Sequence, residues 1–196
     1  MAGCGDRLGN EALLRDHLTA VANGELVLRP LGPADGPGYR ELRLRALAEF
    51  PDAFTSSAAE AAATADDWSV RRMLPRDGHV LIGALIGERL AGTAGLDRQP
   101  REKERHKALL YGMFVAPEHA GRRIGRKLVD AVVGEARQWP GLEQIDLTVT
   151  RSNERARRLY LDAGFVTFGI EHRAIKVAGV YYDKEHMVLF LDDHGH

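Results

Sequence analysis

The sequence is poor in the residues that build disulfide frameworks and metal centres. It has a single cysteine, Cys4, which excludes an intramolecular disulfide and any cysteine-based zinc cluster. No base stands next to Cys4, so we interpret its thiol as incidental rather than catalytic. Among the eight histidines only His194 and His196 are spaced like metal ligands, and we interpret them as part of a tail. We therefore expect no metal site.

Long apolar runs and an excess of one charge are also absent. No apolar segment approaches the ~20 residues that span a bilayer. The 27 basic and 28 acidic residues give a net charge of −1, which argues against bulk attraction to nucleic acid or to an anionic membrane. The N-terminus shows no basic segment followed by an apolar one, as a secretory signal requires. We therefore expect a cytoplasmic protein with neither a nucleic-acid nor a membrane partner.

The length and the order of apolar patterns favour one domain with a short extension. Residues 1–24 carry apolar residues at helical spacing and end at Asn23-Gly24, which predicts a helical N-terminal extension. Residues 25–192 hold the remaining elements of a single domain. Hydrophobic residues make up 44% of the 196, which is enough for a packed core.

Apolar periodicity predicts strands and helices in a mixed order. Strands are expected at residues 25–29, 79–86, 90–96, 108–115, 145–150, 165–170 and 182–191. Helices are expected at residues 39–50, 58–74, 122–139 and 153–163. The second and third strands form a hairpin, while the helical crossover between residues 108 and 150 predicts a parallel pair. This order indicates an α/β (α+β) fold with a mixed, mostly antiparallel central sheet flanked by helices.

The segment V-A-P-E-H-A-G-R-R-I-G-R-K-L, residues 115–128, has the pattern of an anion site. A strand ends, a loop turns at Gly121, and a helix is expected to begin at about Arg122. The first amides of a helix have no internal partner, and the helix dipole adds positive potential that suits a pyrophosphate. Gly121 and Gly125 lack side chains, so a phosphate can approach the backbone. The alternative is an ordinary helix N-terminus with a solvated basic face.

A second segment, N-E-R-A-R-R-L-Y-L-D-A-G-F at residues 153–165, strengthens the first. Together they resemble the GNAT superfamily of acetyl-coenzyme A-dependent N-acetyltransferases, with its patterns V-x-P, then R/Q-x-x-G-x-G/A, and N-x-x-A-x-x-L/F-Y-x-x-x-G-F. The resemblance extends over about residues 25–191 and includes the R-x-x-A-L-x-x-x-P-x-A-F run from Arg43 to Phe54. Ala120 stands at the family's Arg or Gln position and Arg123 at its middle glycine, and both leave the backbone amides available.

The resemblance implies a GNAT-like acyl-CoA N-acyltransferase fold for residues 25–192, with acetyl-CoA as co-substrate and no metal. The backbone of Met113, Phe114 and Val115 would pair with the pantetheine arm, and Asn153 would lie near the pantetheine amides. The pyrophosphate would be held by a loop and its backbone amides, formed by Ala120, Gly121, Arg122, Arg123, Ile124, Gly125 and Arg126.

Tyr160 is the candidate catalytic residue, because the resemblance places it near the thioester sulfur. Acetyl transfer to an amine expels a thiolate, and a phenol with a pKa of ~10 stays protonated at neutral pH and can donate to it. The alternative is an aromatic residue of the core. A backbone amide near Phe114 would polarise the thioester carbonyl. For the general base the candidates are a water chain or one of His106, Glu104, Asp146 and His186.

We interpret the chain as an N-acetyltransferase that moves an acetyl group from acetyl-CoA to a primary amine within a ternary complex. The alternatives are a different acyl-CoA as donor, or a non-catalytic CoA-binding regulatory module on the same scaffold. The acceptor would be a small-molecule or peptide amine, with its pocket lined by Tyr181, Tyr182 and Asp183 or else formed elsewhere. Pairing of the last strands of two copies would give a homodimer.

Overall fold

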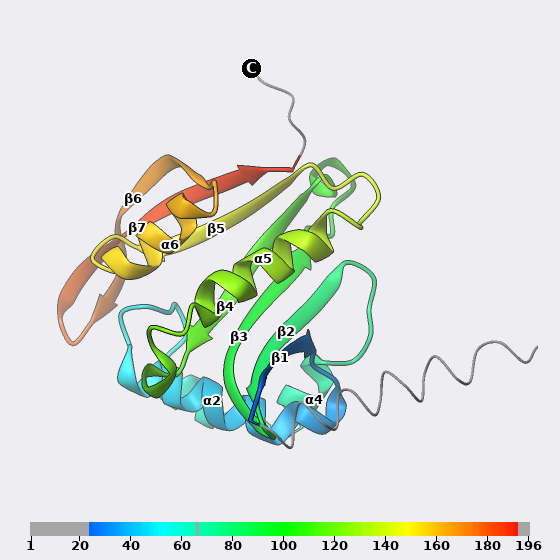
Figure 1. The fold of residues 1–196 in the computed structure, drawn as a ribbon. Helices are drawn as coiled ribbons and strands as arrows, with labels where there is room; N and C mark the ends of the chain where they lie inside the picture. The colour runs from blue at the N-terminus through cyan, green and yellow to red at the C-terminus, as the bar shows by residue number, and fades with distance from the viewer. Residues whose placement is uncertain (1–23, 66, 192–196) are drawn as a thin grey trace, which may run out of the picture.

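In the computed structural model, residues 24–65 and 67–191 are described, and the expected N-terminal helix lies outside them. One seven-stranded sheet crosses this part of the chain in the order β1-β2-β3-β4-β5-β7-β6 (Figure 1). Neighbouring strands are antiparallel except for β4 and β5, which are parallel as expected. The strands are β1 (Leu26–Pro30), β2 (His79–Ile86), β3 (Arg89–Arg98), β4 (Lys107–Val115), β5 (Gln144–Thr150), β6 (Val166–Val177) and β7 (Val180–Phe190).

Helices pack on both faces of the sheet. The larger apolar cluster joins Val80 and Ile82 of β2 to α5 (Ile124–Ala136) and α6 (Glu154–Asp162). The smaller cluster joins Leu81 and Leu85 of the same strand to the other helical layer. Because neighbouring residues of a strand point to opposite faces, the two clusters lie on opposite sides of the sheet. The second layer consists of α2 (Gly36–Glu49), α3 (Ala58–Ala62) and α4 (Trp68–Arg72).

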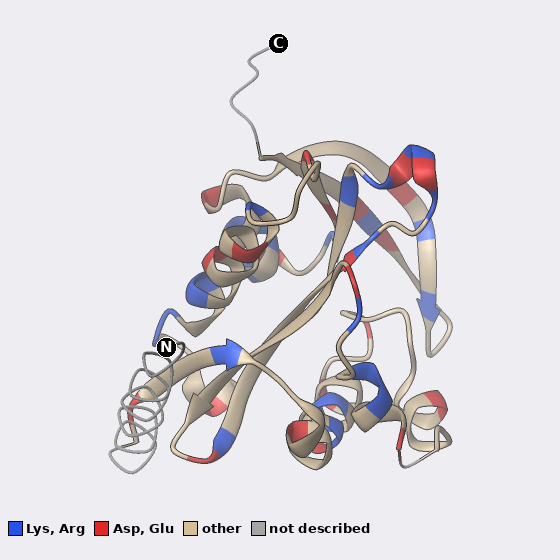
Figure 2. Cartoon of the chain, turned by 90° about the vertical axis from the view of Figure 1, so that its right-hand side faces the viewer, with Lys and Arg blue, Asp and Glu red and all other residues tan. Residues whose placement is uncertain are grey.

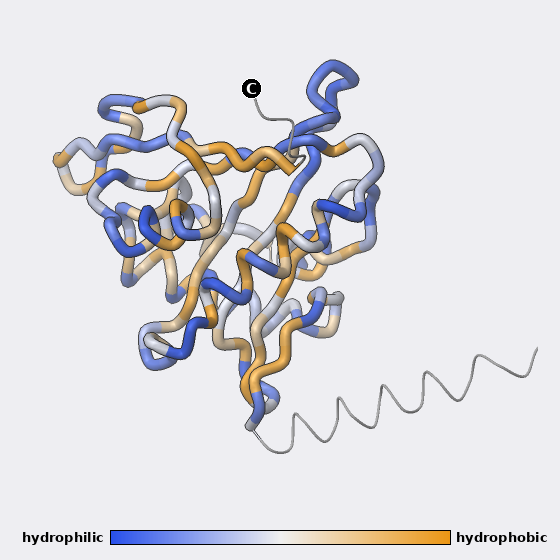
Figure 3. Tube along the Cα trace, turned by 45° about the horizontal axis from the view of Figure 1, so that its top comes forward, coloured by the Kyte–Doolittle hydropathy of each residue, from blue (hydrophilic) through white to orange (hydrophobic). Residues whose placement is uncertain are grey.

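Helix α5 lies across the sheet and supplies much of the larger core (Figure 1). Its apolar residues recur every three to four positions, which places them on one face of the helix. The buried members are Ile124, Leu128, Val129, Val132 and Ala136. Figure 3 shows the hydrophobic residues concentrated along the central strands and the hydrophilic ones on loops and outer helix turns. Basic and acidic residues are mixed over that outer surface (Figure 2).

The expected helix at residues 58–74 is wrong, because the chain forms two short helices there, α3 and α4. The Arg40 guanidinium donates to the carbonyls of Ala62 and Thr64 at 3.3 and 3.2 Å. Carbonyls held from outside the segment interrupt the helical hydrogen-bond series, which needs the same oxygens as acceptors. Trp68 then stacks on Tyr39 of α2 and fixes α4 as a separate unit.

Other element boundaries also differ from the sequence-based expectation, for example at α2, which begins at Gly36 and not at Tyr39. Helix α5 begins at Ile124 and not at Arg122, because Gly121 and Arg123 adopt left-handed φ values of 80° and 58°. Strand β6 continues to Val177, well past the expected end at residue 170. No helix among the described residues is long and apolar enough to cross a membrane.

Candidate active site

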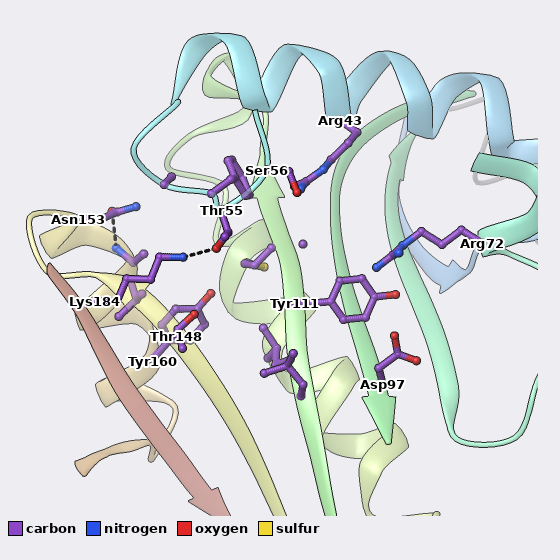
Figure 4. Close-up of a pocket in the computed structure, with 18 residues that line it drawn as sticks. Arg43, Thr55, Ser56, Arg72, Asp97, Tyr111, Thr148, Asn153, Tyr160 and Lys184 are labelled. Atoms are coloured by element: carbon purple, nitrogen blue, oxygen red, sulfur yellow. Dashed lines mark hydrogen bonds between the residues drawn. The ribbon is translucent and has the colours of Figure 1, made fainter. Parts of the chain in front are cut away.

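A gap opens in the sheet between its two parallel strands. The β4–β5 ladder covers only Lys107–Leu109 against Gln144–Asp146, and the strands have no paired residues beyond it. A cleft of about 380 Å³ lies along this gap. It is lined by β4 and β5, by the segment after α2, and by residues of α4 and α6. Strand β4 separates its two groups of polar side chains (Figure 4).

A bulge at Gly112 bends β4 beside the gap. Thr93 of β3 pairs with Phe114 whereas Gly95 pairs with Tyr111, so β4 carries one extra residue between these pairs. Gly112 has a φ of 62°, a conformation that glycine adopts without a steric penalty. Its carbonyl accepts a hydrogen bond from the Thr93 hydroxyl at 3.1 Å. The bulge therefore turns the end of β4 away from β5.

The loop after β4 presents the backbone amides expected for an anion site. Helix α5 starts at Ile124. The Lys127 amide donates to the carbonyl of the N-cap residue Arg123, four positions earlier. The amides of the first helical turn consequently have no intrahelical acceptor. Arg45 of α2 holds the loop through Glu118 with two contacts of 2.6 and 2.8 Å, and it lowers the pKa of that carboxyl to about 2.

The two glycines of this loop have different surroundings. A Cβ on Gly121 would meet nothing within 4 Å, so its backbone is open to a ligand. A Cβ on Gly125 would lie 3.3 Å from both Met113 and Leu159. Gly125 therefore allows α5 to pack closely against β4 and α6.

Tyr160 lies on α6 at the wall of the cleft and is 5% exposed. Its ring packs edge-on against Phe165 at 5.8 Å between centroids. Burial raises the pKa of the Tyr160 phenol above its ordinary value. The ring is thus part of the core while the residue also lines the cleft, a position compatible with both interpretations of Tyr160.

Asn153 caps α6 and also lines the cleft. Its side-chain oxygen accepts from the Ala156 amide at 3.1 Å (Figure 4), so the remaining donor of this carboxamide is its amide nitrogen. The helix is also anchored by Arg157, which donates to the Glu185 carboxylate of β7 at 2.5 Å. Glu185 is 3% exposed and accepts a second bond from Thr167. These contacts fix the position of Tyr160 relative to β5 and β7.

Charged side chains that the sequence did not single out line the other part of the cleft. Arg43 of α2 and Arg72 of α4 approach it beside Tyr111 and Asp97 (Figure 4). Burial raises the pKa of the Tyr111 phenol to about 12, and its hydroxyl bonds His79 Nε2 at 2.9 Å. We call Arg43, Arg72, Tyr111 and Asp97 together the arginine side of the cleft. Of its members only Arg43 lies in a motif noted in the sequence, the run that ends at Phe54.

Lys184 joins β7 to the segment that follows α2. It is 6% exposed, and its Nζ donates to Thr55 Oγ1 at 2.5 Å. Nearby, the Thr150 hydroxyl donates to the Asp52 carbonyl at 2.6 Å. Burial lowers the pKa of the Lys184 ammonium. The segment after α2 is therefore held over the end of β5 and β7, where it closes the cleft from that side.

None of the four residues that the sequence analysis offered as a general base is among the residues that line this cleft. Asp146 accepts from Gln144 at 2.8 Å, and His186 bonds Glu171 at 3.1 Å on the sheet edge. Glu104 and His106 belong to the connection before β4. The three residues suggested for the acceptor pocket lie along the β6–β7 hairpin, where Asp183 bonds His172 and the backbone of Arg173.

Comparison with known proteins gives matches at the level of family and fold. Residues 42–165 match the model of the Acetyltransferase (GNAT) family. A mycothiol acetyltransferase from Propionibacterium freudenreichii subsp. shermanii is 36% identical over 83 residues, or 42% of this chain. That match covers 24% of the relative, so the chain spans about a quarter of its length.

Solved structures share the whole described architecture. An acetyltransferase of the GNAT family from Streptococcus pneumoniae has a TM-score of 0.74 at 20% identity, covering 85% of this chain and 99% of that one. The yncA structure from Salmonella typhimurium, which contains its cofactor acetyl-CoA, has a TM-score of 0.72 at 21% identity and covers 88% and 97%. The family match, together with the shared fold, places the chain among the acyltransferases. It belongs to the GNAT acetyltransferase family, whose model spans more than half of its length.

Proposed function

We propose that this protein transfers an acetyl group from acetyl-CoA to a primary amine by direct attack within a ternary complex. The observation that carries the proposal is the gap between β4 and β5, with Tyr160 on its wall and the start of α5 at its end. A gap of this kind offers free strand edges for the pantetheine amides and a helix N-terminus for the pyrophosphate.

The residues around the gap fit acetyl-CoA. The open Gly121 backbone and the amides up to Arg126 suit the two phosphates, because donors without internal partners converge there. The backbone of Met113, Phe114 and Val115 forms the strand edge for the pantetheine arm, with the Asn153 amide nitrogen opposite. Ala120 and Arg123 contribute their backbones, since each replaces a family side-chain preference without removing an amide.

The proposed transfer starts from a neutral amine, and every bond and proton in it is accounted for. The nitrogen lone pair attacks the thioester carbonyl carbon, and the C–N bond forms as the carbonyl oxygen takes up negative charge. Collapse of this intermediate breaks the C–S bond, and the Tyr160 phenol donates its proton to the leaving sulfur. The phenol is restored by a proton from the acetylated nitrogen. An amine that arrives as ammonium first loses one proton to solvent.

The comparisons support the donor more than the acceptor. The Salmonella neighbour was determined with acetyl-CoA, and the Propionibacterium relative is named for acetylation of mycothiol, a small molecule. A small-molecule or peptide amine is accordingly the proposed acceptor class.

Thermal unfolding with acetyl-CoA, CoA, ATP and NAD is the first test. A ligand at ~100 times its Kd adds about 2.7 kcal/mol to the unfolding free energy, so acetyl-CoA and CoA should raise the Tm and the two nucleotides should not. Thiol release with a panel of amines then measures turnover. Binding without release for any amine or acyl-CoA would instead identify a regulatory CoA-binding module. Faster thiol release from a longer acyl-CoA than from acetyl-CoA would identify the longer acyl-CoA as the donor.

A further inference from the structure

The charges on the cleft wall do not balance. Three cationic side chains line it, namely Arg43, Arg72 and Lys184, against the single carboxylate of Asp97. That carboxylate is already bound by Arg76 at 2.7 and 3.0 Å. The arginine side of the cleft therefore has an excess of positive charge that no described side chain neutralises.

Both guanidiniums on this side lie over aromatic rings. Arg43 lies over Phe54, with 4.6 Å from its Cζ to the ring centroid. Arg72 lies over Tyr111 at 4.4 Å and over Trp68 at 5.4 Å. Stacking restricts the orientation of a guanidinium and leaves its edge, which carries the donors, for a ligand. The two side chains are consequently ordered without an anionic partner.

Each guanidinium also has a buried nitrogen with no hydrogen-bond partner among the described residues. These atoms are Nη1 of Arg43 and Nε of Arg72. Leaving a buried charged donor unpaired costs free energy, and two like charges side by side add repulsion. The aromatic rings compensate part of this cost, and a bound anion would attract both groups.

The phosphates of a CoA bound as proposed lie too far away to supply that anion. The proposed phosphate loop follows Val115, four residues beyond Tyr111 on β4. Because of the bulge, this stretch matches only the three residue steps from Gly95 to Gly92 on β3, so at about 3.3 Å per residue the two places lie roughly 10 Å apart along the strand. The arginine side instead lies where an acceptor would reach the thioester from the α2 and α4 face of the sheet.

We propose that Arg43 and Arg72 form a carboxylate-binding subsite and that the acceptor is an amine carrying a carboxylate, as a free amino acid does. The inference rests on the proposed acetyl transfer for its substrate and adds the acceptor class to it. A carboxylate matches the planar, two-donor edge of a guanidinium, and its negative charge offsets the excess at the cleft wall.

Matched pairs of amines test the subsite by turnover. Thiol release is measured at fixed acetyl-CoA for each free amino acid and for its carboxamide, with glycine and glycinamide as the smallest pair. The amine of a carboxamide is less basic, so chemistry alone favours the amide. We expect kcat/KM for the preferred acids to exceed that of their amides by about 10- to 100-fold, as for a hydrogen bond to a charged group.

Substitution of either arginine should remove this preference. In Arg43→Gln and Arg72→Gln the acid should lose about 10-fold or more in kcat/KM, mainly through KM, while its amide changes little. Arg72→Lys retains charge without the planar fork and should be intermediate. Arg71→Gln is the matched control, because Arg71 is the exposed neighbour on α4 that pairs with Asp67. An unchanged Tm shift with acetyl-CoA confirms that a variant is folded.

A binding measurement makes the result independent of turnover. The CoA-loaded protein is unfolded thermally with N-acetylamino acids and with the corresponding N-acetyl carboxamides. Tighter binding of an acid, lost in both Gln variants, supports the subsite even where no amine is acetylated. Equal effects of acids and amides, or phosphoethanolamine preferred over every carboxylate, would overturn it and leave acetyl transfer standing. Absence of any acetyl-CoA shift contradicts the proposed function, and the same ligands without CoA then decide the subsite.

Discussion

The two sides of the cleft are built by different means. The side that ends at the α5 loop uses mainly backbone: the edge of β4, the open Gly121 and the amides of the first helical turn. The arginine side uses side chains, and they come from α2, α4, β3 and β4. Backbone groups bind what every member of a family shares, whereas side chains from distant elements can change one at a time. Under the proposed function, recognition of the donor and of the acceptor would therefore depend on separate groups that can change independently.

Tyr160→Phe should have the largest effect, because it removes the one reacting side chain proposed on the backbone-built side. We expect kcat for acetyl transfer to fall by about 100-fold, with the acetyl-CoA Tm shift retained, since the ring still packs on Phe165. Steady-state thiol release measures kcat, and thermal unfolding measures cofactor binding. An undiminished kcat would exclude proton donation by Tyr160.

Glu185→Gln should weaken the bond that anchors α6 to β7. Because α6 carries Tyr160, the variant tests the side of the cleft opposite the arginines. Loss of the charged bond to Arg157 should lower the unfolding free energy by about 1–3 kcal/mol at pH 7. The Arg157 side chain, with Thr167, lowers the pKa of Glu185 against the opposing effect of burial. Its contribution is thus present above the ordinary value of 4.5 and disappears as pH falls through the lower folded pKa.

Urea unfolding at several pH values checks this expectation. The wild type and Glu185→Gln should converge in acid. Glu171→Gln is the control, because Glu171 is exposed on β6 beside His186, and it should change stability by less than about 0.5 kcal/mol. A constant difference at all pH values would contradict the assignment.

Arg123→Gly tests whether the left-handed backbone of the loop before α5 is strained. Arg123 holds a left-handed φ of 58°, which costs a residue with a side chain about 1–2 kcal/mol. Part of the gain is offset by the greater freedom of glycine in the unfolded chain, so we expect stabilisation by about 0.5–1 kcal/mol. Denaturant unfolding measures it. Arg122→Gly relieves no left-handed residue and should not stabilise; equal gains in both variants would refute the strain.

His79→Gln should have the smallest effect and tests the arginine side alone. Burial, together with the charges of Arg76 and Arg72, lowers the pKa of His79 below its ordinary 6.5. The unfolded chain then binds the proton more readily, so wild-type stability falls as pH drops below that value. The variant should lose this part of the slope. Unfolding free energies measured between mildly acidic and neutral pH give the answer, and identical slopes would show that His79 does not contribute.

Elements with regular periodicity could be predicted from the sequence. The stripe of α5, the alternation of Ile145, Leu147 and Val149 in β5, and the hairpin of β2 and β3 are confirmed. The continuation of β6 was missed because it is an edge strand with polar residues on both faces and irregular pairing near Arg173. Exposed strands of this kind lack the apolar alternation on which the prediction depends.

The candidate site divides in the same way. The α5 loop and Tyr160 lie within two short motifs, so local sequence identified them. Arg43, Arg72 and Lys184 meet only in the folded chain, and each taken singly resembles an ordinary surface cation. The interruption of the 58–74 helix has the same origin, because Arg40 reaches its carbonyls from another helix.

The bulge at Gly112 changes which residues of β4 face the core. Before it, the even-numbered Ala108 and Leu110 belong to the core under α5; after it, the odd-numbered Met113 and Val115 do. Phe114 correspondingly faces the aromatic residues at the end of α2. In a regular strand that kept all of these residues, Phe114 would face the core and Met113 and Val115 would turn away from it. The one extra residue therefore decides which side chains at the end of β4 the core receives.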